Sequence, residues 1–148
     1  MNLIEQVNAG IITAMKAKEA DRLRALRGIK SAFLLLQTGE GVTEVTDDMC
    51  IKALQKLAKQ RKDSLEIYKT QGREDLASVE SAELAIIEEF LPAQMSETEV
   101  REKVQAIITE SGLSGAANMG KVIPLAMKAL GGQADGKLIS QLVKELLN

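Results

Sequence analysis

Apolar residues recur at intervals of three and four along almost the whole chain, which is the period of an amphipathic α-helix. The pattern breaks at glycine-containing segments and before Pro92, because glycine favours turns and a proline pushes the preceding residue out of helical geometry. The pattern therefore predicts an all-α fold. Its helices span residues 3–15, 20–37, 46–72, 76–90, 96–112, 118–130 and 136–147.

The segment that follows Leu91-Pro92 divides these helices into two groups. Ser96 and Glu99 have the spacing of a capping box, in which the serine hydroxyl accepts the glutamate amide and the glutamate side chain reaches back to the serine amide. A new helix should begin there. We therefore expect a helical N-terminal domain at 1–92 and a small three-helix C-terminal domain at 93–148.

Two features of the N-terminal domain follow from the same pattern. Leu57, Leu65, Ile87 and Phe90 recur on single helical faces, so we expect them to form part of its core. The segment "GEGVTEV" at 39–45 has two glycines and no regular apolar spacing, which indicates a mobile loop.

The amino-acid composition agrees with a helical fold and favours a reducing compartment. Aromatic residues make up 2% of the chain, and the single cysteine, Cys50, excludes an intramolecular disulfide, which is typical of a reducing compartment. No basic segment leads into an apolar run at the N-terminus, and no apolar run has membrane-spanning length. We expect a cytoplasmic protein without a membrane partner.

The segment "GGQADGKL" at 131–138 has a glycine, four residues and then Gly-Lys, like most of a phosphate-binding loop. Such a loop follows a buried strand, places Ser or Thr after the lysine and opens a long helix. Here a helix is predicted before it, a leucine follows the lysine, and ten residues remain. We expect no nucleotide. Instead, Gly131 and Gly132 should end one helix in left-handed geometry and Asp135 should cap the next.

Candidate catalytic groups are few. The absence of histidine removes the commonest general base and metal ligand. Cys50 has no histidine to activate it and is interpreted as a small core or flank residue. Glu80 and Glu83 lie one turn apart, but carboxylates on an amphipathic helix usually form its solvated face. No catalytic residue, metal site or cofactor is predicted.

Charge is distributed unevenly along the chain. The overall net charge of −2 combines about +4 for residues 1–73, −8 for 74–110 and +2 for 111–148, so basic segments at both ends leave nucleic acid as a possible partner. A basic stripe of Arg24, Arg27 and Lys30 follows one helix. These three residues are a second candidate RNA-binding surface. A solvated helix face with partial pairing to nearby acids explains the stripe equally well.

Three long segments resemble the YqeY family of bacterial proteins. They are "DRLRALRGIKSA" at 21–32, "KQRKDSLEIYKTQGREDLASVESAELAIIEEFLPAQMSETEV" at 59–100 and "NMGKVIPLAMKALGGQADGKLISQLVKELL" at 118–147. The match spans nearly the whole chain. The C-terminal third also resembles the tail domain of GatB, a subunit of the tRNA-dependent amidotransferase.

The resemblance implies a two-part all-α protein with a GatB-like C-terminal unit. One departure from a regular helix is Pro124, which removes an amide and crowds the carbonyl of Gly120. We therefore expect a bent or irregular turn around Gly120 and Lys121.

Three functions are compatible with these observations. The first is a non-catalytic accessory protein that binds tRNA or another RNA, or is associated with tRNA amidation. Its phosphate-binding residues would be Lys121, Lys128, Lys137 and Lys144. The second, implied only by family association, is an amidotransferase-like carbon–nitrogen ligase with glutamine as amido donor. The third is a protein-interaction module that binds a helical partner, or a second copy of this chain, through helix 46–72.

Overall fold

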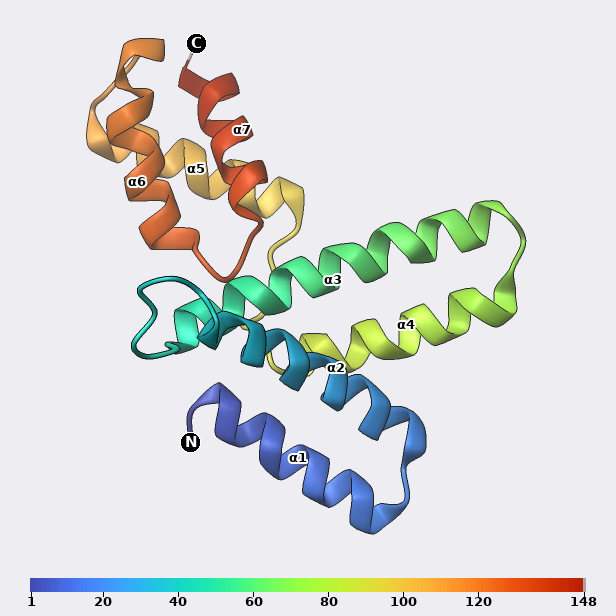
Figure 1. Cartoon of the computed structure of the whole chain (residues 1–148). Helices are drawn as coiled ribbons and strands as arrows, with labels where there is room; N and C mark the ends of the chain where they lie inside the picture. The colour runs from blue at the N-terminus through green and yellow to red at the C-terminus, as the bar shows by residue number, and fades with distance from the viewer. Residues whose placement is uncertain (148) are drawn as a thin grey trace. The chain divides into compact units, whose positions relative to one another are not determined.

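The computed structural model describes residues 1–147, which form α-helices and one short 3₁₀ helix (Figure 1). The α-helices are α1 (Leu3–Ala17), α2 (Ala20–Gln37), α3 (Asp47–Thr70), α4 (Glu74–Glu89), α5 (Glu97–Ser111), α6 (Met119–Leu130) and α7 (Gly136–Leu147), and the 3₁₀ helix is η1 (Ala116–Asn118). The predicted all-α fold is confirmed, and each predicted helix end lies within about two residues of the observed one.

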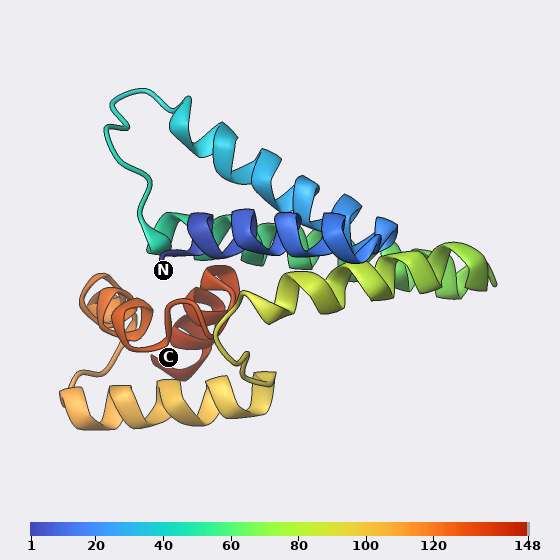
Figure 2. The same ribbon diagram turned by 90° about the horizontal axis from the view of Figure 1, so that it is seen from below.

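The chain forms two compact units, Met1–Leu91 and Pro92–Asn148. In the first unit, α3 and α4 form a long helical hairpin, and α1 and α2 pack against the part of it where α3 begins and α4 ends (Figures 1 and 2). In the second unit, each of α5, α6 and α7 packs against the other two. Each unit therefore has a core of its own.

Side-chain caps start several of these helices. Thr46 Oγ1 accepts the amide three residues later at 3.3 Å, and Ser96 Oγ accepts the Glu99 amide at 3.2 Å. These helix starts are confirmed, and the structure shows the serine half of the predicted capping box. A complete capping box, which the apolar pattern did not reveal, joins Asn2 and Glu5 at the start of α1.

The core of the N-terminal unit takes residues from all four of its helices. Ile87 is buried, and Leu57 and Phe90 are partly buried against the same core, so the prediction for these three is confirmed. Leu65 is half-buried and lies seven residues further along α3 than Ala58, the last buried α3 residue of this core. Helical period alone does not show where along a long helix the core ends.

Glu80 and Glu83 do not form a solvated face, so that expectation was wrong. Their side chains are only 12% and 14% exposed, and Arg61 Nη1 of α3 lies 3.1 Å from an oxygen of each. Arg24 Nε of α2 lies 3.6 Å from the other oxygen of Glu83. The two carboxylates thus join three helices through partly buried ion pairs, a contact between distant segments that a single helix period does not reveal.

Residues 38–46 connect α2 and α3 by turns and bends. This agrees with the predicted loop at 39–45, and its mobility stays a prediction.

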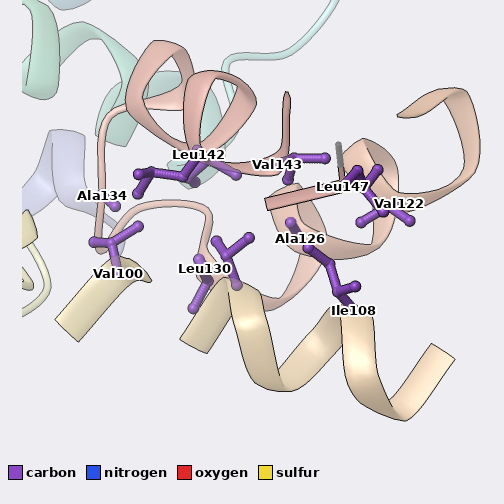
Figure 3. Close-up of a cluster of buried hydrophobic side chains, with 11 residues drawn as sticks. Val100, Ile108, Val122, Ala126, Leu130, Ala134, Leu142, Val143 and Leu147 are labelled. Atoms are coloured by element: carbon purple, nitrogen blue, oxygen red, sulfur yellow. The ribbon is translucent and has the colours of Figure 1, made fainter. Parts of the chain in front are cut away.

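The C-terminal core is apolar throughout (Figure 3). Its buried residues come from α5 (Val100, Val104, Ile108), α6 (Val122, Ala126, Leu130), the following turn (Ala134) and α7 (Ile139, Leu142, Val143, Leu147). On α5 and α6 these residues recur every four positions, so one narrow face of each helix is buried and the opposite face is left to solvent.

Pro124 lies inside α6, but the irregular turn is not where we expected it. Gly120 and Lys121 both belong to α6, and the irregular geometry is the η1 turn just before that helix. The missing Pro124 amide would have bonded to the Gly120 carbonyl, so the α-helix tolerates this one lost hydrogen bond.

The two glycines after α6 have different roles. Gly132 has φ +86° and is left-handed as predicted, whereas Gly131 has φ −57° and ψ 134°, so the prediction for Gly131 was wrong. Its backbone approaches the preceding turn closely, because a Cβ added there would lie 2.5 Å from the Met127 carbonyl oxygen. Glycine is required at 131 by space rather than by the sign of φ.

Alanine substitutions at two glycines of the C-terminal unit should therefore have opposite effects. Gly131→Ala should lower the free energy of unfolding by about 1–3 kcal/mol, because the new methyl group collides with backbone. Gly120→Ala, at a helical site with no atom within 4 Å of the added Cβ, should raise it by about 0.4–1 kcal/mol. Urea denaturation followed by circular dichroism measures both; equal effects would contradict the packing at 131.

The ion pairs of Glu80 and Glu83 generate a second prediction. Arg61→Ala should lower the free energy of unfolding by about 1–2 kcal/mol, because it leaves two partly buried carboxylates with fewer donors. Arg73→Ala is the matched control, since Arg73 pairs with Asp75 at an exposed site and its loss should change little. An Arg61 variant as stable as the Arg73 variant in urea would show that the buried pairs do not stabilise the unit.

Candidate nucleic-acid interface

The four predicted phosphate-binding lysines lie in two pairs on the C-terminal unit. Lys121 and Lys128 are seven residues apart on α6, and Lys137 and Lys144 are seven apart on α7. Seven residues are close to two helical turns, so each pair shares one face of its helix. The buried residues of α6 and α7 occupy the opposite faces, and all four lysines are exposed.

These lysines are not neutralised by acidic side chains of the described chain. No acidic side chain of residues 1–147 forms an ion pair with any of the four. The nearby Glu145 of α7 is paired with Arg101 of α5, at 3.1 Å. Four ammonium groups are thus available for an anionic partner.

An apolar side chain interrupts the basic face of α6. Leu125 lies four residues after Lys121 and three before Lys128, and it is 47% exposed. It borders a shallow depression of about 280 Å³ that is also lined by Ile107, Glu110 and Ser111. The sequence analysis did not predict an exposed Leu125 on this face, although its spacing from the two lysines places it on the same side of the helix.

The arginine stripe of α2 does not remain intact. Arg24 forms ion pairs with Asp21 at 3.3 Å and with Glu83 of α4 at 3.6 Å. Arg27 and Lys30 are exposed and form no ion pair with the described acidic side chains. Arg24 is therefore partly neutralised by ion pairs although its side chain is 59% exposed, and two cations without an acidic partner among residues 1–147 remain on the surface.

The turn at 131–135 is a helix-turn-helix connector. Two of its backbone carbonyls bond within the C-terminal unit: Gln133 O accepts the Met95 amide at 2.8 Å, and Gly132 O accepts from Gln94 Nε2 at 2.6 Å. Asp135 Oδ1 accepts the amide of Lys137, at 3.3 Å, as the predicted cap of α7. A carboxylate therefore occupies the helix N-terminus that a phosphate would use in a phosphate-binding loop.

The remaining chemical candidates are structural. Cys50 is fully buried in the N-terminal core, which confirms its interpretation as a core residue. Among residues 1–147, no three His, Cys, Asp or Glu side chains are arranged to hold a metal ion. No helix in this range combines the length and apolar character needed to cross a bilayer.

Comparison with known proteins gives one family and two relatives. A family model described as Yqey-like protein matches residues 4–147. Two curated relatives are both named "Altered inheritance of mitochondria protein 41, mitochondrial". The Pyrenophora tritici-repentis protein is 25% identical over 150 residues, covering 98% of this chain and 81% of that relative. The Meyerozyma guilliermondii protein is 31% identical over 123 residues, covering 80% of this chain and 64% of that relative.

The environment of Cys50 makes its thiol chemistry predictable. Burial, and secondarily the charge of Asp47, raises the pKa of this thiol above its ordinary value of 9.0. Labelling by a thiol reagent should therefore be at least about 100-fold slower in the folded protein than in urea, because it requires opening of the core. Absorbance of the released chromophore measures the rate; labelling equally fast in both states would contradict the burial.

The same raised pKa makes the stability of the protein depend on pH, and this dependence is a second check on the burial of Cys50. The folded state binds the thiol proton more tightly than the unfolded state does, and this difference contributes to the free energy of unfolding. The contribution is fully present below pH 9.0 and is lost as pH rises through the folded-state pKa. Cys50→Ala should lose less stability than the wild type when urea denaturation is moved from about pH 7 to about pH 10.5.

Proposed function

The chain belongs to the YqeY family, and from this premise we propose that it is a non-catalytic accessory protein that binds RNA, with tRNA as its ligand. The proposed contacts run from Lys121, Lys128, Lys137 and Lys144 to phosphate oxygens. The resemblance of the C-terminal third to the GatB tail domain supports tRNA as the RNA ligand and supports a role associated with tRNA amidation.

The observation that carries this proposal is the state of the basic side chains. Arg24 and Arg61 hold glutamates between helices, whereas the four C-terminal lysines are exposed and have no acidic partner among residues 1–147. Counterion release from phosphates needs cations that are not already neutralised by the protein.

The residue types of this unit favour structured RNA over an unpaired strand. Residues 92–148 contain no Phe, Tyr or Trp, so stacking platforms for splayed bases are not supplied by this unit. Lysines on two packed helices instead suit recognition of a phosphate backbone by charge and shape. A folded molecule with helical stems, such as tRNA, presents such a backbone.

We propose the cytoplasm as the location because the one cysteine is a free, buried thiol. The word "mitochondrial" belongs to the names of the two relatives.

A carbon–nitrogen ligase activity is the alternative function. Formation of amide product from Glu-tRNA, glutamine and ATP by the purified chain would replace the accessory role.

Substitution of the lysines tests the RNA contact directly. Replacing Lys121, Lys128 and Lys137 together by Gln should leave the helix content unchanged but weaken tRNA binding. It should also flatten the salt dependence, because each lost phosphate contact removes about one unit from the slope of log K against log salt. Fluorescence anisotropy of labelled tRNA over a salt series measures both quantities.

The matched control replaces three exposed lysines of α3, namely Lys52, Lys56 and Lys69, by Gln. This variant should bind tRNA with the affinity and slope of the wild type. If the two triple variants behave alike, charge alone and not the C-terminal surface determines binding. A loss confined to a third variant, with Arg27 and Lys30 replaced by Gln, would place the interface on α2 instead.

A further inference from the structure

Helix α1 carries more apolar surface than its own unit buries. The side that faces α2 is identified by Gly10, where an added Cβ would lie 3.3 Å from Leu26 Cδ1. Ile12 follows Gly10 by two residues and so lies about 200° around the helix, on the opposite side. It is 54% exposed, and Met15, one turn further on, is 53% exposed.

These residues belong to a continuous row, which we call the α1 edge. It consists of Ile4, Asn8, Ile12 and Met15, spaced as one face of a helix. Ile4 and Asn8 are half-buried, and Asn8 Oδ1 is buried without a hydrogen-bond partner in the described chain. Figure 1 shows α1 at the border of the N-terminal unit, beside α2, and within that unit α1 packs against α2 and α3.

The charges beside the α1 edge complement each other in one arrangement of two copies. Glu5 and Lys16 are both exposed and, being eleven residues or about three turns apart, border the same side of the helix. If a second α1 runs antiparallel, Glu5 of each copy lies opposite Lys16 of the other, and the apolar positions of the two edges meet between them. A parallel arrangement places like charges together, which is unfavourable.

We propose that the α1 edge joins two copies of this chain, with their α1 helices antiparallel about a two-fold axis between residues 10 and 11. A two-fold contact uses the same patch on both copies, as this self-complementary edge requires. We place the contact on the α1 edge and not on helix 46–72, because two leucines of that helix already serve the core. Leu54 is fully buried, and Leu57 is packed against the core. One helical edge is small for an interface, so the dimer is weak.

Sedimentation velocity of the full chain tests the dimer through concentration and one apolar residue. The mass of the wild type should rise toward that of two copies between about 10 μM and about 1 mM, the range expected for a small interface. Ile12→Asp should weaken self-association at least about tenfold, because it buries a carboxylate in the contact. Leu35→Asp, at an α2 residue that is 70% exposed, is the matched control and should associate like the wild type.

A charge exchange tests the antiparallel orientation. Glu5→Lys and Lys16→Glu should each weaken self-association, because each places two pairs of like charges across the axis. An equimolar mixture of the two variants should restore it, since every pair then joins a lysine to a glutamate, and added salt should reduce the rescue. Circular dichroism of each variant establishes that α1 is still helical after loss of the Glu5 cap.

Two results would overturn the proposal. One is a wild type that stays at the mass of one copy up to about 1 mM, well above the range of specific weak dimers; the α1 edge would then be open to a different protein or simply solvated. The other is Ile12→Asp associating like the wild type, which would show that another surface joins the copies. A mixture that fails to associate while each single variant is weakened would reject the antiparallel arrangement.

Discussion

Each helix of this protein must turn one apolar face toward a core, and the positions of all the other side chains depend on that constraint. In the C-terminal unit the buried faces of α6 and α7 hold residues such as Val122 and Leu142. Lys121, Lys128, Lys137 and Lys144 are consequently placed on the outside. The candidate RNA-binding surface is thus a geometric result of packing the core, and it needs no loop or ligand to organise it.

Arginine and lysine have different roles in this protein, and the chemistry of the side chains explains the difference. In the N-terminal unit Arg61 reaches two carboxylates from one guanidinium nitrogen, and a guanidinium is suited to partly buried pairs because it is weakly hydrated and has several fixed donors. The C-terminal unit instead displays lysines, whose compact ammonium groups are strongly hydrated and stay at the surface. Arginines therefore hold helices together here, while lysines remain available to an anionic partner.

Helix α1 shows that burial can also be incomplete. Its apolar arc is wider than the contact with α2 and α3 requires, so Ile12 and Met15 remain exposed while Val7 and Ala14 are buried. A wide arc on a border helix and a basic face on a separate unit can serve different partners. The proposed self-association through α1 and the proposed RNA binding through α6 and α7 use different helices, so neither proposal depends on the other.

The sequence by itself determined the helices and their ends and predicted a division near Pro92, because helical period, caps and proline geometry act over a few neighbouring residues. Resemblance of three long segments also identified the YqeY family. Only the tertiary structure decided that Glu80 and Glu83 are held by arginines, that Leu65 lies outside the main core and that Gly131 is required by a close carbonyl. Each of these depends on the distance to atoms of another helix or turn, which the period of one helix does not contain.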